Sequence, residues 1–219
     1  MTQAVRTVRP ETVRAWVDGW VVSRNAPGPV REPWGLRVDV GLPGHLTRHI
    51  VPAPTPATLR HLTAVLNVPG TWLKLCAPAE AVARWLPPSW AVQEPEFMMT
   101  GPLEESTATA PTGYTLAVTT RAGVTVARLL TQAGEVAARG QMAITGAITG
   151  AMAVVDQVET AAHHRRRGLG TVVMKALSSS AAKGGAGTGV LVATPAGRSL
   201  YETLGWGVHT PMTAAVRTG

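Results

Sequence analysis

One segment constrains the fold of this chain more than any other. It runs from Val154 to Leu177 and joins an apolar stretch, a turn with three consecutive arginines and a second apolar stretch. Residues 154–160 predict a strand, because β-branched side chains predominate there. A helix is predicted next, because apolar residues recur at helical spacing at Leu169, Val172, Val173 and Leu177. The segment therefore predicts a strand, a basic turn and a helix in direct succession.

The basic turn has the composition of an anion-binding site. A helix start leaves backbone N–H groups without partners and carries the positive end of the helix dipole. Gly168 and Gly170 allow a sharp turn and a close approach of the backbone to a ligand. Residues 165–167, all arginine, add full positive charges. We therefore expect a phosphate or pyrophosphate group to bind here.

The spacing of the glycines and arginines limits which class of phosphate ligand this turn can bind. A P-loop would need Gly-Lys followed by Ser or Thr, and a dinucleotide fingerprint would need a glycine in place of Val173. The pattern Arg165-x-x-Gly168-x-Gly170 after a strand instead resembles the pyrophosphate loop of the GNAT superfamily, the acyl-CoA-dependent N-acyltransferases. Downstream, a short apolar strand leads into a block that resembles the last motif of the same superfamily: Leu200-Tyr201-Glu202-Thr203-Leu204-Gly205-Trp206. The resemblance covers the chain from about Gly113 to its last residue.

The resemblance implies an α/β (α+β) fold with a GNAT-like mixed, mostly antiparallel central sheet flanked by helices. Residues 113–219 would form the acetyl-CoA-binding catalytic domain. Three strand-like runs, at 114–120, 124–131 and 135–145, are separated by short turns and predict antiparallel hairpins. This order departs from the superfamily, in which two helices separate the first strand from the second.

Residues 1–105 predict a smaller αβ unit, which begins with a helix at 10–23. This unit would lie on the acceptor side of the enzyme or be a degenerate GNAT-like half. It either supplies the missing helices and continues the sheet, or packs beside the catalytic domain as a second copy. The sequence leaves both options open.

Roles for individual residues follow from the resemblance. Tyr201 occupies the position of the general acid that protonates the leaving thiolate, and a phenol has a suitable pKa for this role. The backbone of the strand before the turn would bind the pantetheine arm and polarise the thioester, and the turn would bind the pyrophosphate. The expected acetyl-CoA-binding residues are Val158, Glu159, Thr160, Arg165, Arg166, Arg167, Gly168, Leu169, Gly170 and Thr171.

A general base is less clearly marked. Asp156 has the same strand phase as Val158 and Thr160, whereas Glu159 has the opposite phase unless a bulge resets it. An acid inside an apolar strand is costly unless it has a partner or a function. We therefore name Asp156 or Glu159 as the candidate base, prefer Asp156, and keep water as the alternative.

Composition bears on location and partners. The net charge of +7 and the pI of about 10.7 come mainly from scattered arginines, without the aromatic and basic pattern of a nucleic-acid interface. A single cysteine, Cys76, excludes an internal disulfide, and no metal site is expected. Residues 1–14 lack the apolar core of a signal peptide, and the most apolar run, 142–155, is shorter than the roughly 20 residues of a membrane span. We expect a cytoplasmic protein with neither membrane nor nucleic acid as a partner, and a homodimer stays open.

These observations predict an acetyl-CoA-dependent N-acetyltransferase. The acceptor would be a primary amine of a small molecule, which attacks the thioester directly in a ternary complex. The alternatives are a protein N-terminal or lysine acetyltransferase, and a catalytically silent acyl-CoA-binding regulatory protein. An aromatic-walled acceptor pocket is a further hypothesis, because the first half of the chain contains Trp16, Trp20, Trp34, Trp72, Trp85 and Trp90.

Overall fold

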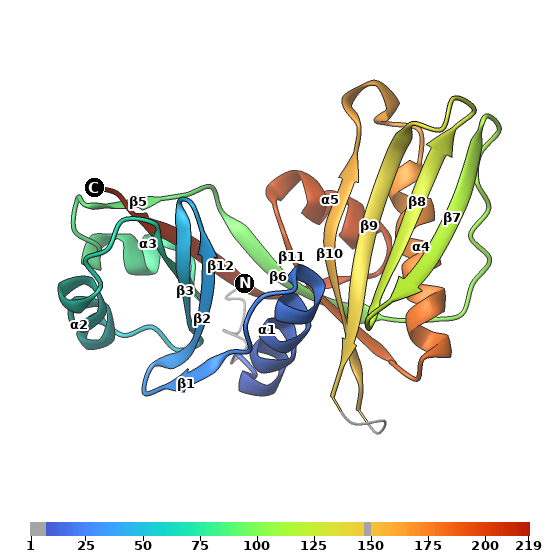
Figure 1. Ribbon diagram of the computed structural model, residues 1–219. Coiled ribbons are helices and arrows are strands. Elements are labelled where there is room, and N and C mark those ends of the chain that lie inside the picture. Colours follow the sequence, from blue (N-terminus) through green and yellow to red (C-terminus); the bar gives the residue numbers. More distant parts are fainter. Residues whose placement is uncertain (1–7, 147–149) are drawn as a thin grey trace, which may run out of the picture.

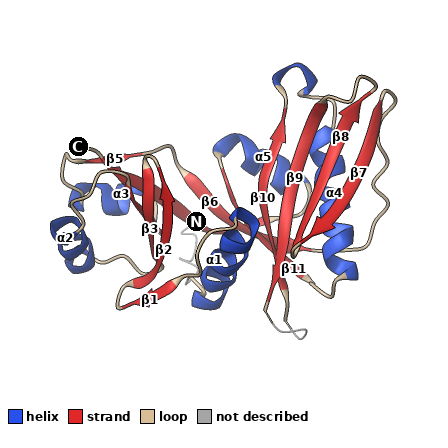
Figure 2. Cartoon of the chain, viewed as in Figure 1, coloured by secondary structure: helices blue, strands red, loops and turns tan. Residues whose placement is uncertain are grey.

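The computed structural model describes residues 8–146 and 150–219 (Figures 1 and 2). Part of the expected non-signal segment, residues 1–7, lies outside the described residues. The described helices are α1 (Pro10–Arg24), α2 (Pro56–Val65), α3 (Ala79–Val82), α4 (Leu169–Lys183) and α5 (Pro195–Thr203), with 3-10 turns η1 (Ala83–Trp85) and η2 (Ala162–His164). The described strands are β1 (Val30–Glu32), β2 (Gly35–Leu42), β3 (His45–Val51), β4 (Thr71–Leu75), β5 (Trp90–Val92), β6 (Glu96–Pro102), β7 (Tyr114–Arg121), β8 (Val124–Thr131), β9 (Val136–Thr145), β10 (Met152–Thr160), β11 (Thr188–Ala193) and β12 (Gly207–Arg217).

The described strands join into one sheet of twelve, in the order β1-β2-β3-β4-β12-β6-β11-β10-β9-β8-β7, with β5 paired to β12 beside this path. Two strand pairs in it are parallel, β3 with β4 and β10 with β11, and the others are antiparallel. The expected hairpins β7–β8 and β8–β9 are present. The expectation of a mixed, mostly antiparallel sheet flanked by helices is therefore confirmed.

Two regions of this sheet can be followed in Figure 1. The first region, on the left, contains β1 to β5, α2 and α3. The second region, on the right, contains β7 to β11, α4 and α5. The two are linked by β6, which pairs with β11 and β12, and by β12, which pairs with β6 near its start and with β4 and β5 near its end. The N-terminal half of the chain thus continues the sheet, whereas a boundary between separate domains at 105–113 stays a prediction.

Helix α1 precedes the first region in sequence but packs on the second. It contacts β9, β10 and β11, where Val154 of β10 faces it. Helix α4 covers the opposite face of the same strands, because Ala153 and Val155 lie in the cluster that includes Leu169 and Val173. The alternation of β10 between these two cores fixes which of its side chains can face α1, as the twofold periodicity of a strand requires.

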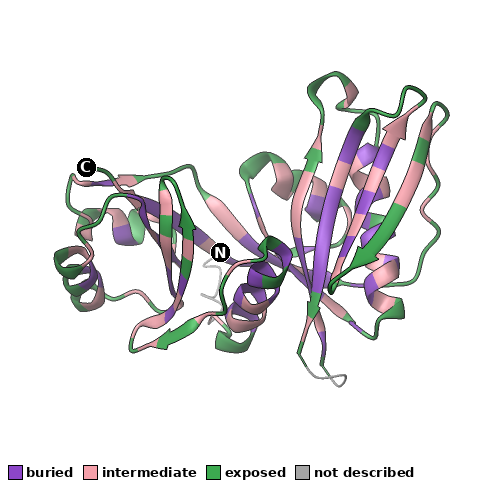
Figure 3. Cartoon of the chain, viewed as in Figure 1, coloured by how far each residue is buried: buried purple, intermediate pink, exposed green. Residues whose placement is uncertain are grey.

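Burial follows this layering (Figure 3). One core lies between α4 and the sheet of the second region, another lies between α1 and both regions, and a third surrounds α2 in the first region. The single cysteine, Cys76, belongs to the middle core, and burial raises its pKa to about 12. A thiol of this kind stays protonated, as expected for a core residue.

None of the described helices has the length and apolar character needed to cross a lipid bilayer.

Candidate active site

The turn between β10 and α4 has the backbone geometry of an anion site. Gly168 is the N-cap of α4 with φ of 73°, and no side chain caps this helix start. The helix ladder begins where the N–H of Val172 donates to the carbonyl of Gly168 at 3.2 Å. The three amides before it, from Leu169 to Thr171, have no helical partner, as at any helix start. This uncapped first turn of a 15-residue helix is where an anion gains most from the helix dipole.

The two glycines of this turn are required for different physical reasons. Gly168 has left-handed backbone with open space around its Cα, so it is needed for the conformation of the turn. Gly170 is helical, and a Cβ there would lie 3.0 Å from Cδ2 of Leu200 in α5. Gly170 therefore allows α5 to approach the start of α4. Sequence reasoning assigned Gly170 to the ligand alone, because this contact joins distant segments.

The three arginines are exposed, and two of them are held in place. Arg167 donates from Nη1 to the hydroxyl of Tyr114 at 3.0 Å, and this hydroxyl shares a hydrogen bond of 2.9 Å with Nδ1 of His164. Arg165 donates from Nε to the carbonyl of Thr160 at 3.3 Å. Tyr114 lies 53 residues before Arg167, and no sequence signal connected the two. The turn thus presents positive charge in a partly fixed arrangement.

Strand β10 bulges just before the turn. Asp156 pairs with Gln141 of β9 and Glu159 pairs with Arg139, so two residues of β10 lie opposite one residue of β9. Gln157, inside the bulge, has φ of 51°, a value that non-glycine residues rarely adopt. Pairing of β10 with β11 ends at Val154, so the two parallel strands have no ladder between them beyond that point. Within the described residues, the backbone of 158–160 therefore pairs with no strand on the β11 side.

Tyr201 lies on α5 within the core of the second region. Its side chain is buried, and its ring centroid lies 6.1 Å from that of Trp206. Burial raises the pKa of Tyr201 to about 12, and the negative charge of Asp156 adds to this shift. The phenol therefore stays protonated at neutral pH.

Asp156 is already engaged by α1. Arg24 donates from Nε to Oδ2 at 2.5 Å and from Nη2 to Oδ1 at 3.0 Å. Ser23 donates from its hydroxyl at 3.2 Å, and the backbone N–H of Gln157 donates at 2.9 Å. The hydrogen bond to Asp156 raises the pKa of Arg24 above its usual value. Sequence reasoning missed Arg24, which lies 132 residues from Asp156 and carries no local motif.

Glu159 stands apart from this cluster. Its side chain is exposed, and within the described residues it forms no ion pair. The bulge resets the phase of β10 between Asp156 and Glu159, as the sequence allowed. The assignment of either acid as the base stays a prediction.

The six tryptophans of the first half of the chain lie in three places. Trp16 and Trp20 of α1 belong to the middle core, and Trp72 of β4 lies near His45, with ring centroids 5.2 Å apart. The others, Trp34, Trp85 and Trp90, belong to the core around α2. No single core contains all six, and an acceptor pocket walled by some of these side chains stays a prediction. In the described part of the chain, no three His, Cys, Asp or Glu side chains gather as metal ligands would.

Known proteins share this architecture. The sequence profile of the FR47-like protein family matches residues 133–213. No curated protein matches the sequence. A GCN5-related N-acetyltransferase from Kribbella flavida superposes with a TM-score of 0.65 and 17% identity, covering 99% of this chain and 97% of that one. An acetyltransferase of the GNAT family from Novosphingobium aromaticivorans superposes with a TM-score of 0.58 and 19% identity, covering 94% and 97%.

A protein made of two GNAT units also resembles the chain. This tandem GNAT protein from the clavulanic acid biosynthesis pathway gives a TM-score of 0.52 at 12% identity, covering 72% of this chain and 66% of that one. At these identities the structures establish a shared fold, and the family profile covers the segment that contains the bulge, the basic turn and α5. The profile match and the shared fold together support the resemblance to the GNAT superfamily.

Proposed function

We propose that the protein transfers an acetyl group from acetyl-CoA to a primary amine of a small molecule, by direct attack in a ternary complex. The observation that carries this proposal is a combination of three features at one place. The start of α4 is uncapped, β10 and β11 have no ladder between them beyond Val154, and α5, which carries Tyr201, approaches the start of α4 through Leu200. The GNAT fold supports acetyl transfer in general, and these features suit acetyl-CoA as the donor.

The residues present fit an acyl-CoA molecule. The amides from Leu169 to Thr171 are donors suited to a pyrophosphate, and Arg165 to Arg167 add charge beside them. The free edge of β10 at Val158 to Thr160 offers backbone donors and acceptors to the amide groups of the pantetheine arm. The thioester would then lie near the bulge, between Asp156 and Tyr201.

The chemistry needs one bond formed, one bond broken and two proton movements: the nitrogen loses a proton to water, and the released thiolate takes up a proton from solvent. The amine nitrogen attacks the carbonyl carbon of the thioester, the C–N bond forms, and the C–S bond breaks to release a thiolate. With its pKa raised to about 12, Tyr201 supplies an O–H at any physiological pH. Complete proton transfer to a thiolate of ordinary basicity would be uphill by roughly 4 to 5 kcal/mol. Tyr201 therefore acts chiefly by donating a hydrogen bond to the sulfur as charge develops on it.

Water is the proton acceptor that this arrangement favours. The oxygens of Asp156 accept from Arg24, Ser23 and Gln157, so an incoming amine would compete with three donors already in place. Asp156 is better suited to orient Arg24 and the end of α1. This reassigns the preferred candidate base to a positioning role.

The test is release of coenzyme A from acetyl-CoA in the presence of a panel of amines, including peptides with a free N-terminus or a lysine. We expect release with one class of small amines. The Tyr201→Phe variant should lower kcat by about 100-fold, the usual cost of removing one hydrogen-bond donor to charge that develops in the transition state. The only other tyrosine gives a matched variant: Tyr114→Phe loosens Arg167 and His164, so it should raise the KM for acetyl-CoA and spare kcat.

Other outcomes point to the alternatives. Release only with peptides would favour a protein acetyltransferase. Tight binding of acetyl-CoA without release from any amine would favour a silent acyl-CoA-binding protein. Equal kcat for wild type and Tyr201→Phe would remove Tyr201 from the mechanism.

A further inference from the structure

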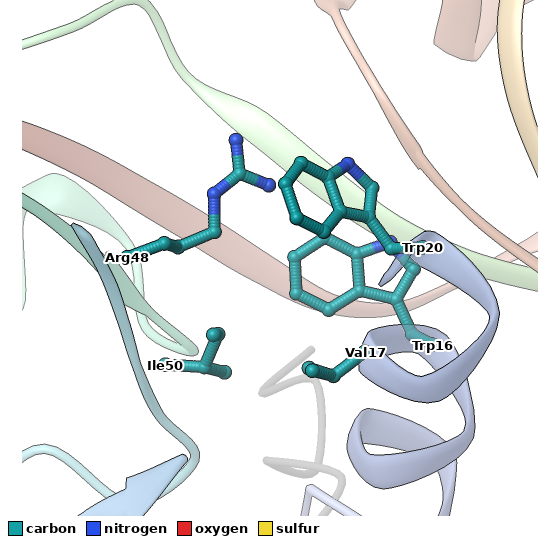
Figure 4. A pocket seen from close by; sticks show the side chains of 5 residues that line it. All are labelled: Trp16, Val17, Trp20, Arg48 and Ile50. Atoms are coloured by element: carbon teal, nitrogen blue, oxygen red, sulfur yellow. The ribbon is translucent and has the colours of Figure 1, made fainter. Parts of the chain in front are cut away.

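A row of cationic and aromatic side chains leads away from the candidate active site toward the first region. It begins at Arg24, which binds Asp156 and also lies over the ring of Trp20, with Cζ 5.9 Å from the ring centroid. Arg48 of β3 lies over the same ring from the first region, with Cζ 4.1 Å from the centroid. Figure 4 shows Arg48 and Trp20 pointing toward each other across the junction of β3 and α1. Trp20 thus joins the two regions through two arginines.

The row continues across β3 and β4. Arg48 donates from Nε to Nε2 of His45 at 3.2 Å, and His45 lies against Trp72. Lys74 lies over Trp72 at 5.8 Å and donates to both oxygens of Glu96, at 2.7 and 2.5 Å. Burial, together with the nearby cations, lowers the pKa of His45 to about 4, so His45 is a neutral acceptor for Arg48. The row therefore contains three cations and two carboxylates.

The charges of this row do not balance. Arg24 is paired with Asp156 and Lys74 with Glu96, whereas Arg48 forms no ion pair with any described carboxylate. Burial lowers the pKa of Arg48 to about 10, which leaves it charged at neutral pH. A cation that is partly removed from water and lacks a counter-ion is costly. A ligand with the opposite charge would offset that cost.

The surroundings of the Arg48 guanidinium limit the side from which an anion can reach it. Beneath the side chain, the space lined by Trp16, Val17, Trp20 and Ile50 has no room for a water-sized sphere (Figure 4). Nε is occupied by His45, and the two terminal nitrogens are neither bonded to described residues nor sealed from solvent. The guanidinium therefore lies over the Trp20 ring, with Cζ 4.1 Å from the centroid, and its terminal nitrogens are reachable from solvent. A planar pair of N–H donors of this kind matches a carboxylate or phosphate.

We propose that the acceptor amine carries an anionic group, a carboxylate or a phosphate, and that Arg48 stacked on Trp20 binds this group. The inference rests on the proposed acetyl transfer and names the class of its acceptor. The anion would lie at Arg48, and the amine would extend past Arg24 toward Asp156 and Tyr201.

The wild-type protein gives the first test. Initial rates of coenzyme A release are measured with amino acids of increasing spacing between amine and carboxylate, each beside its own methyl ester. The ester keeps the amine nitrogen and the carbon skeleton and removes the negative charge. Rates are compared per neutral amine, because loss of the nearby charge also lowers the pKa of the amine. We expect the best carboxylate to exceed its ester by about 30-fold in kcat/KM, the usual size of a hydrogen-bonded charge contact. Aminoalkyl phosphates of the same spacing distinguish a phosphate from a carboxylate.

Variants then assign the preference to Arg48. Arg48→Gln should abolish the difference between carboxylate and ester, mainly by raising KM for the carboxylate. Arg48→Lys keeps the charge without the planar fork, so it should retain part of the preference and serves as the test if Arg48→Gln does not fold. Arg60→Gln is the matched control, because Arg60 also lies over a tryptophan, Trp85, at 5.4 Å but on α2. It should keep the wild-type preference.

The possible results separate failure of the acceptor proposal from failure of the proposed function. Equal rates for carboxylate, phosphate and ester in the wild type would overturn the proposal while leaving acetyl transfer intact. A preference that survives in both Arg48 variants would do the same. No release with any amine would mean that the proposed function itself fails, and the acceptor class with it.

Discussion

The parallel strands β3 and β4 in the first region, and β10 and β11 in the second, are each joined through a helix. The helix is α2 in one case and α4 in the other, and both follow the first strand after a short turn. In both regions the second parallel strand also pairs with a strand from the far side of the junction, β12 for β4 and β6 for β11. The N-terminal half therefore contains a strand–helix–strand unit like that of the second region, and it also continues the same sheet.

The turns before α2 and before α4 differ in how many backbone N–H groups they leave without a hydrogen-bond partner. Before α2 the chain reads Pro52-Ala53-Pro54-Thr55-Pro56, with proline as the first helical residue. Proline has no N–H, and the amide of Thr58 donates to the hydroxyl of Thr55 at 3.1 Å. The start of α2 is thus capped and carries no charge of its own, whereas the start of α4 is uncapped and preceded by three arginines.

The strands of the two units differ in how far they stay paired. β3 and β4 pair over five residues, up to Val51 at the end of β3. β10 and β11 pair over three, and β10 then bulges at Gln157 and continues without β11. The same strand–helix–strand unit thus has fully paired parallel strands in the first region and only partly paired ones in the second. A shared fold alone does not create a binding site, and in the first region the proline-rich turn and the unbroken ladder leave fewer backbone groups free for a ligand than in the second.

This comparison of the two regions depends on helix α1, which lies between the first region and β10. A Cβ at Gly19 would lie 2.2 Å from Cγ2 of Val154, so Gly19→Val forces α1 off the sheet. We expect the free energy of unfolding to fall by about 3 kcal/mol, the upper range for overpacking a core. Urea unfolding measures this.

Gly28→Val is the control for this substitution, because a Cβ at Gly28 meets nothing within 4 Å. It should change stability by less than about 0.5 kcal/mol. Similar losses for both variants would show that α1 is not packed on β10 as described.

The second prediction concerns the basic turn. Replacing Arg165, Arg166 and Arg167 together with glutamine should raise the Kd for acetyl-CoA by about 30-fold, from three exposed charge contacts of up to 1 kcal/mol each. The loss should shrink at high salt, because exposed charges are screened. Isothermal titration calorimetry at two salt concentrations measures both effects.

The matched variant for the turn lies beside the other unit. Arg60→Gln with Arg84→Gln removes two arginines near α2, both of which lie over Trp85. Acetyl-CoA affinity should stay within twofold of the wild type, by the same estimate of exposed charges. A comparable loss in both variants would mean that net charge, and not the turn, attracts the ligand.

The smallest expected effect belongs to the bulge. Gln157 has φ of 51°, where a β-branched side chain is disfavoured and glycine is not. Gln157→Val should lower the free energy of unfolding by about 1 kcal/mol, and Gln157→Gly should not lower it. Thr115→Val, at an exposed position of regular strand β7, should be neutral. If Gln157→Val were as neutral as Thr115→Val, the left-handed conformation of the bulge would be wrong.

The sequence by itself determined the local elements of the second region. The strand, basic turn and helix from Val154 to Leu177 were recognisable because β-branched content, glycine spacing and helical periodicity are properties of neighbouring residues. The hairpins β7–β8 and β8–β9 were predictable from their short turns for the same reason. The GNAT resemblance rested on motifs of this local kind.

Only the tertiary structure decided what surrounds those elements. The pairing of β12 with both β6 and β4, the bond from Arg24 to Asp156, and the stacking of Arg48 on Trp20 each join segments far apart in the chain. Such contacts depend on which faces pack together, and a one-dimensional pattern does not specify that. The sequence therefore showed Asp156 as an acid in an apolar strand, but it did not show the partner of Asp156. The partner, Arg24, lies on the first helix of the chain, and this helix packs on strands that come much later in the sequence.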